Sequence, residues 1–107
     1  YVEVSGKQHL VLPYSDVYND SRFVFSQGYG SPADYADLCT RAIDELVREG
    51  RAGSPKMMSI GLHPRLIGQA GRASALRQII EHALGHGDVW LARRIDIAES
   101  WRHQHPA

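Results

Sequence analysis

The sequence has little of several features that would assign it to a function class at once. It contains a single cysteine, so no internal disulfide can form. Twelve basic residues balance twelve acidic ones, and a net charge of zero provides no long-range field to attract nucleic acid or anionic lipid. No apolar run approaches the ~20 residues that span a bilayer, and the first residues lack the pattern of a signal peptide. We therefore expect a soluble, cytoplasmic protein that binds neither nucleic acid nor membrane.

The length and composition fit one small globular domain. The chain has 107 residues, of which 43% are hydrophobic, which is too apolar for a disordered protein. Cys39 falls inside an amphipathic segment, and this predicts a buried thiol of the kind found in a reducing compartment. The chain starts without methionine, in what reads as strand or loop sequence. We therefore expect the natural polypeptide to begin earlier.

Helical periodicity occurs in three segments. They run from Ser31 to Gly50, from Ala73 to Leu84 and from Ile95 to Trp101. At the first of these, Ser31 can cap the helix, Pro32 suits its first turn, and Gly50 predicts its end. Apolar residues recur at three- and four-residue spacing in the first two segments, which predicts one buried face on each helix.

Short apolar runs between these helices predict strands that are buried on both faces. They are Gln8 to Pro13, Lys56 to Leu62 and Val89 to Ala92. The apolar neighbours in the first run argue against an exposed hairpin. The order β-α-β-α-β-α predicts an α/β fold with a parallel sheet. Three such strands would leave an edge exposed, so we expect the sheet to continue into a missing segment or another copy of the chain.

Reacting groups in parallel α/β folds lie just past the carboxyl ends of the strands. His63 follows the second expected strand directly, and an imidazole there can give or take a proton near neutral pH. The alternative is a histidine that bonds a loop carbonyl. Tyr14 and Asp20, in the loop after the first strand, can orient a polar substrate or the histidine itself. Alternatively, Asp16, Asn19 and Asp20 make only turn hydrogen bonds.

Other polar and aromatic residues favour structural roles. His82 and His86 stand four apart on an expected helix, a spacing that suits a shared metal ion. No Glu-x-x-His pattern frames them, so we interpret them as surface or helix-end histidines and assign no metal ligand and no cofactor to this chain. Trp90 and Trp101 have the spacing of core residues.

The third expected strand is followed by Arg93 and Arg94. This pair can clamp an anionic or urea-like group. Pairing with Asp96 and Glu99 along the last helix is the favoured interpretation.

Several motifs, taken in order, resemble the C-terminal half of the polysaccharide deacetylase family. The similarity is closest to the branch that holds allantoinases needing no metal, together with some peptidoglycan deacetylases. The motifs are Leu12-Pro13-Tyr14-Ser15 through Asn19-Asp20, Met57-Met58-Ser59-Ile60-Gly61-Leu62-His63-Pro64, Gly71-Arg72-Ala73, and Val89-Trp90 to Ile97-Ala98. Each is short, but their order and spacing together are fairly specific.

The resemblance implies a distorted (β/α) barrel that hydrolyses a carbon–nitrogen amide bond. His63 matches the histidine of the family's Leu-His motif, a general acid or orienting base that would protonate the leaving nitrogen. Leu62 matches a position that lines the acyl pocket. The matching substrate-side loop carries Tyr14, Ser15, Asn19 and Asp20.

The sequence departs from the family in one large respect. The family's aspartate base and its Asp-His-His metal triad belong to the N-terminal half, and nothing here stands in for them. We therefore expect this chain, as a single C-terminal part of a catalytic domain, to be inactive alone. Its expected partners are a small-molecule amide and the missing barrel half or another copy of the chain, within a homo-oligomer. Whether the complete enzyme uses a divalent metal is left open.

Two other functions fit the sequence. One is an N-deacetylase of polysaccharide or peptidoglycan sugars. The other is a non-catalytic α/β interaction module that completes a partner's sheet.

Overall fold

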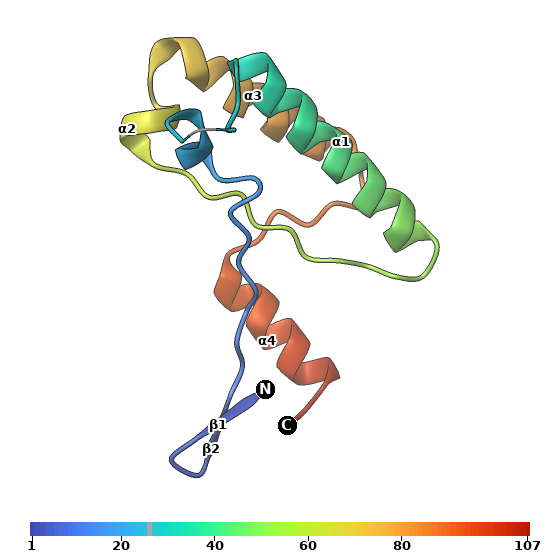
Figure 1. Ribbon diagram of the computed structural model, residues 1–107. Helices are drawn as coiled ribbons and strands as arrows, with labels where there is room; N and C mark the ends of the chain where they lie inside the picture. Colours follow the sequence, from blue (N-terminus) through green and yellow to red (C-terminus); the bar gives the residue numbers. More distant parts are fainter. Residues whose placement is uncertain (26) are drawn as a thin grey trace. The chain divides into compact units, whose positions relative to one another are not determined.

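A computed structural model of the chain describes residues 1–25 and 27–107. The chain forms two compact units, and Figure 1 shows the elements that each contains. One unit joins residues 1–14 to residues 90–107, and the other comprises residues 15–89. The sequence-based assignment of residues 1–107 to one domain remains a prediction.

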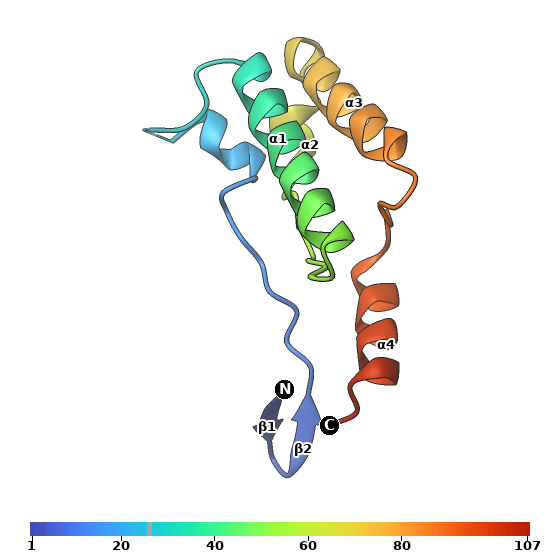
Figure 2. The same cartoon turned by 90° about the vertical axis from the view of Figure 1, so that its right-hand side faces the viewer.

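The unit formed by residues 15–89 is helical. It contains the short 3-10 helix η1 (Asp20–Phe23) and the α-helices α1 (Pro32–Arg51), α2 (Pro64–Ile67) and α3 (Ala70–Gly85). Helices α1 and α3 lie side by side (Figures 1 and 2), and α2 is in contact with η1. None of the helices in the described part of the chain is long and apolar enough to cross a bilayer.

Helix α1 begins as its sequence predicts and ends later. The Ser31 Oγ accepts a hydrogen bond from the Asp34 N–H at 3.2 Å, and Pro32 is the first helical residue. The expected stop at Gly50 is wrong, because the helix includes Gly50 and ends at Arg51. The turn instead uses Gly53, whose φ of 92° favours glycine.

The core of this unit lies between α1 and α3. Its buried residues come from α1 (Tyr35, Ala36, Cys39, Ile43), α2 (Ile67) and α3 (Ala75, Ile79, Ala83). The predicted burial of Cys39 is confirmed, since its side chain is 0% exposed. Burial raises the pKa of this thiol to about 11, so it stays protonated near neutral pH. The fully buried Tyr35 donates its hydroxyl hydrogen to the Tyr18 carbonyl at 3.2 Å.

The other unit holds an antiparallel hairpin and a helix. Strand β1 (Val2–Val4) pairs with β2 (Lys7–His9), and the turn between them places Ser5 and Gly6 at positive φ. Every residue of both strands is exposed. The first expected strand was predicted not to form an exposed hairpin. This prediction is wrong for its first two residues, Gln8 and His9, because both belong to β2.

Among the described residues, this hairpin is the only hydrogen-bonded sheet. Residues 10–13, 56–62 and 89–92, which were expected to form parallel strands, belong to no sheet. Segments of this kind form a ladder only when neighbouring strands are present on their edges. The parallel sheet expected from the periodicity is therefore absent from the described part of the chain.

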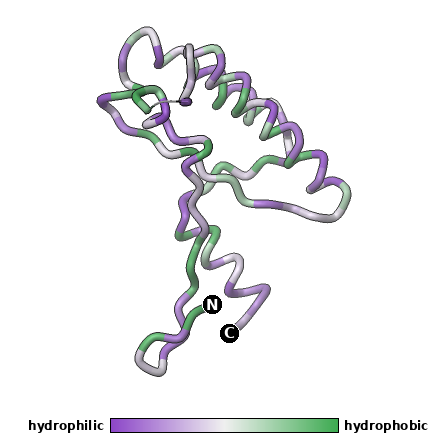
Figure 3. The backbone as a smooth tube through the Cα atoms, viewed as in Figure 1, coloured by the Kyte–Doolittle hydropathy of each residue, from purple (hydrophilic) through white to green (hydrophobic). Residues whose placement is uncertain are grey.

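Apolar side chains in these segments remain uncovered. The exposed fractions are 62% for Val11, 61% for Trp90 and 56% for Leu91. Figure 3 shows hydrophobic residues in the segments after β2 and before α4 (Arg94–Gln104). The predicted core positions of Trp90 and Trp101 are wrong here, since Trp101 is also 49% exposed. Exposed apolar residues at this density mark candidate interaction surfaces.

The two arginines before and at the start of α4 make different contacts. Arg93 forms a two-point ion pair with Asp96, at 2.9 and 2.6 Å, which confirms the pairing favoured from the sequence for this residue. The guanidinium of Arg94 instead donates to the carbonyls of Leu12 and Pro13, at 3.0 and 3.3 Å. Arg94 therefore ties α4 to the segment that follows β2.

Candidate active site

His63 lies where an extended segment turns into a helix. It precedes α2 directly, and its carbonyl accepts hydrogen bonds from the N–H groups of Leu66 and Ile67 at 2.8 and 3.1 Å. Pro64 fills the first helical position, which needs no N–H donor. The His63 side chain is 45% exposed. The imidazole is thus fixed at its backbone and still reachable from solvent.

The His63 side chain is held by Asp20. One carboxylate oxygen of Asp20, Oδ1, lies 2.7 Å from the ring nitrogen Nδ1 of His63. The other, Oδ2, accepts a hydrogen bond from the backbone N–H of His63, also at 2.7 Å. Both distances are short, as expected for hydrogen bonds to an ionised acceptor. A single carboxylate therefore fixes both the backbone and the ring of the candidate catalytic residue.

Local structure places Asp20 for this contact. Asn19 caps η1 by accepting a hydrogen bond from the Ser21 N–H at 2.8 Å. The Asp20 N–H donates to the Gly61 carbonyl at 3.0 Å, which joins the loop to the segment that leads into His63. Asp20 is 0% exposed. A buried carboxylate is costly unless it is paired, and here both of its oxygens have partners.

This geometry sets what the ring can do chemically. In the tautomer that donates from Nδ1 to Asp20, the neutral ring carries its lone pair on Nε2, where it can accept a proton. Once protonated, the imidazolium is stabilised by the same carboxylate and can give the proton back from Nε2. The Asp20–His63 pair therefore has the parts of a general acid or base.

The other predicted site residues differ in exposure and in their hydrogen bonds. Leu62 directly precedes His63 and is 44% exposed. The Ser15 hydroxyl accepts a hydrogen bond from the Val17 N–H at 3.2 Å, and Asn19 is 5% exposed in its capping role. Tyr14 is 61% exposed and belongs to the other compact unit. Direct contact with His63 is therefore shown for Asp20, and substrate contacts of the others remain predictions.

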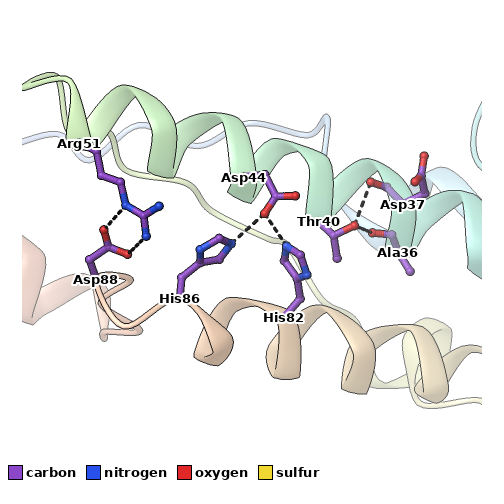
Figure 4. Close-up of polar contacts among 8 residues, drawn as sticks. All are labelled: Ala36, Asp37, Thr40, Asp44, Arg51, His82, His86 and Asp88. Atoms are coloured by element: carbon purple, nitrogen blue, oxygen red, sulfur yellow. Dashed lines mark hydrogen bonds and ion pairs between the residues drawn. The ribbon is translucent and has the colours of Figure 1, made fainter.

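A second cluster of polar side chains lies between α1 and α3 (Figure 4). Oδ1 of Asp44, on α1, lies 2.6 Å from Nε2 of His82 and 2.8 Å from Nε2 of His86, both on α3. Hydrogen bonds from His82 and then His86 hold the pKa of the Asp44 carboxyl below its usual value. Next to it, Arg51 and Asp88 form a two-point ion pair at 2.7 and 3.0 Å.

Sequence reasoning missed two of these groups. The Gly61 carbonyl carries no side-chain signal, so its contact with Asp20 was invisible. Asp44 reads as one more polar residue on the outer face of a helix. Its position on α1, facing two histidines on the neighbouring helix, could have been found only by knowing that α1 and α3 pack together.

Comparisons with known proteins find similar sequences and similar solved structures. No protein-family model matches the chain. A putative polysaccharide deacetylase of Schizosaccharomyces pombe is 39% identical over 97 residues, which cover 91% of this chain and 30% of that protein. The crystal structure of a probable polysaccharide deacetylase from Pseudomonas aeruginosa PAO1 matches with a TM-score of 0.89 and 46% identity, covering 92% of this chain and 33% of the other.

An allantoinase is also among the structural relatives. The crystal structure of Puue allantoinase matches with a TM-score of 0.92 and 48% identity, covering 96% of this chain and 34% of that protein. The chain thus spans about a third of the length of these relatives. The predicted resemblance and fold class are confirmed: the chain is similar in sequence and in α/β structure to a C-terminal part of proteins of the polysaccharide deacetylase family.

Proposed function

We propose that this chain contributes the proton-transfer group of a hydrolase that cleaves a non-peptide carbon–nitrogen bond in an amide. The observation that carries the proposal is the Asp20–His63 pair, in which a fully buried carboxylate bonds Nδ1 of a half-exposed imidazole at 2.7 Å. An exposed surface histidine would have no buried acid behind it. Because Asp20 contacts Nδ1, the other ring nitrogen, Nε2, is left for proton transfer.

The reaction assigns a defined step to His63. Water adds to the amide carbonyl carbon and releases one proton to a base outside residues 1–107, the carbon–nitrogen bond breaks, and the leaving nitrogen takes up a proton. The His63 imidazolium donates that proton from Nε2, and Asp20 stabilises the ring in its charged form before the transfer. In this role Asp20 is a positioning residue, because its carboxylate is buried and contacts the ring instead of the substrate.

We propose a cyclic amide such as allantoin as the substrate. Support comes from the 48% identity to an allantoinase over 96% of this chain. Leu62 is proposed to line the acyl pocket, since it is exposed next to His63. Tyr14, Ser15 and Asn19 are proposed to contact the substrate's polar groups, as the resemblance implies.

Deacetylation of sugar polymers is the second candidate. It is favoured by the S. pombe and P. aeruginosa relatives, whose names describe polysaccharide deacetylases. Both reactions hydrolyse an amide, so the proton donor would act in the same way. A third candidate, a module that completes a partner's sheet, is favoured by the exposed Val11, Trp90 and Leu91.

We make further proposals about the domain, the partners and the cellular location of the chain. We propose that residues 1–107 form the C-terminal part of one catalytic domain, and that the rest of the barrel or another copy of the chain covers its exposed apolar segments. The buried, protonated Cys39 suits the proposed cytoplasmic location. We also propose that the protein forms a homo-oligomer.

Activity with two substrates distinguishes the candidates. The full-length protein and its His63→Ala variant are each assayed for hydrolysis of allantoin and of N-acetylglucosamine oligomers. The His103→Ala variant is the control, because His103 is exposed at the end of α4. The proposal expects allantoin hydrolysis with a kcat/KM on the order of 10²-fold or more above that for the sugar, since sites that hydrogen-bond their substrate discriminate strongly. Preference for the sugar would favour the deacetylase, and no hydrolysis of either would favour the interaction module.

A further inference from the structure

Two histidines on α3 and one aspartate on α1 direct their ligand atoms at one point (Figure 4). His82 and His86 are four residues apart, so their side chains leave the same face of α3. Asp44 reaches toward both from the neighbouring helix, and its Oδ1 is the common partner of the two Nε2 atoms. The three ligand atoms all lie within 4.8 Å of one another.

We infer that Asp44, His82 and His86 form a binding site for a divalent transition-metal ion of the Zn²⁺ class, which links α1 to α3. Two imidazole nitrogens and one carboxylate oxygen are a ligand set that Zn²⁺ takes in proteins, with water as a fourth ligand. The spacing of His82 and His86 alone supplies two ligands, which is too few to define a site. Asp44 supplies the third ligand that they lacked.

The distances fit an ion with modest adjustment. Zn–N and Zn–O bonds of about 2.0–2.1 Å at tetrahedral angles separate neighbouring ligand atoms by about 3.3 Å. The Asp44 oxygen now lies 2.6 and 2.8 Å from the two Nε2 atoms, and no pair of ligand atoms is farther apart than 4.8 Å. Shifts of less than about 1.5 Å per pair bring all three within range of one ion.

Exposure and helix packing allow these shifts. The side chains are 53% exposed for Asp44, 34% for His82 and 23% for His86, so small rotations displace no core residue. The helices beneath them are held together by the buried core between α1 and α3. The helix backbones are therefore fixed while the ligand side chains can adjust, and solvent can supply the fourth ligand.

Zinc titration of the metal-free full-length protein tests the site. The wild-type protein is expected to bind one equivalent of Zn²⁺ more than the His82→Gln, His86→Gln and Asp44→Asn variants do, measured against a competing chromophoric chelator. For this added equivalent, losing one ligand is expected to weaken the affinity on the order of tenfold or more. Added Zn²⁺ is also expected to raise the Tm of the wild type more than that of the variants.

Asp37→Asn is the matched control, because Asp37 is a similarly exposed carboxylate on α1 that pairs with Arg41. It is expected to keep the wild-type zinc stoichiometry. If a variant fails to fold, a zinc-soaked crystal of the wild type decides the matter through anomalous scattering. A peak bonded to Nε2 of His82 and His86 supports the site. Equal zinc binding by wild type and variants, or no peak at these residues, overturns it.

Discussion

Replacing His63 with alanine is expected to lower the kcat of the full-length protein by about 10²- to 10⁴-fold, the usual contribution of a general acid or base. KM should change by less than about threefold, because the proton is transferred only in the transition state and substrate binding is largely kept. The loss of Nε2 removes the donor for the leaving nitrogen. Steady-state kinetics with the preferred amide substrate measure both constants.

The folding of the His63→Ala variant is checked separately from its activity. His63→Ala leaves Oδ1 of the buried Asp20 without its ring partner, so we expect a lower Tm, and unchanged far-UV circular dichroism shows that the variant is folded at the assay temperature. His103→Ala is the control for the removal of an exposed imidazole. A near-normal kcat in the His63→Ala variant would remove the role assigned to this residue.

Replacing Asp20 with alanine is expected to reduce both turnover and stability. Two hydrogen bonds to the carboxylate disappear, and the His63 N–H loses its acceptor. We expect the free energy of unfolding to fall by about 2–4 kcal/mol, less than a fully buried ion pair would lose because the His63 ring is partly exposed. The kcat should fall on the order of 10²-fold or more, since the ring loses its fixed orientation and its stabilising charge.

Asp16→Ala is the matched control for Asp20, since Asp16 is an exposed carboxylate in the same loop. Urea unfolding and steady-state kinetics are compared for both variants. The Asp20→Asn variant separates the two effects, because it keeps the size of the side chain and removes its charge. An Asp20→Asn protein with wild-type kcat would show that the carboxylate serves the fold alone.

The helices could be predicted because their signals are local. Ser31 and Pro32 mark the start of α1 within four residues of sequence, and the spacing of apolar residues gives the buried face that contains Cys39. The end of α1 was misplaced, since Gly50 and Gly53 both lie near it and only the backbone conformation shows which one turns the chain. Helix boundaries are less well determined than helix faces.

The sheet could not be predicted in the same way. Apolar runs such as residues 56–62 indicate burial on two faces, but a strand also needs neighbours along its edges. The periodicity of one segment does not show whether those neighbours belong to the same chain. The spacing of apolar residues likewise predicts a buried Trp90, whose side chain is 61% exposed.

Of the two residues in the candidate site, His63 could be singled out from the sequence and Asp20 could not. His63 stood out because a histidine and a proline follow an apolar run. Its partner Asp20 is 43 residues away and was one of several acidic loop residues, and a role in orienting the histidine was only one of its possible roles. Tertiary packing selects among such residues, because burial makes a paired carboxylate tolerable and an unpaired one costly.

The protonation pattern of the His63 ring is the most direct test of the Asp20–His63 pair. Nitrogen NMR of the full-length protein labelled with ¹⁵N-histidine reports which ring nitrogen carries the hydrogen when the imidazole is neutral. We predict the Nδ1–H form in the wild type and its loss in the Asp20→Ala variant. A neutral His63 that carries its hydrogen on Nε2 in the wild type would contradict the account, because the ring would then have no lone pair on the nitrogen assigned to proton transfer.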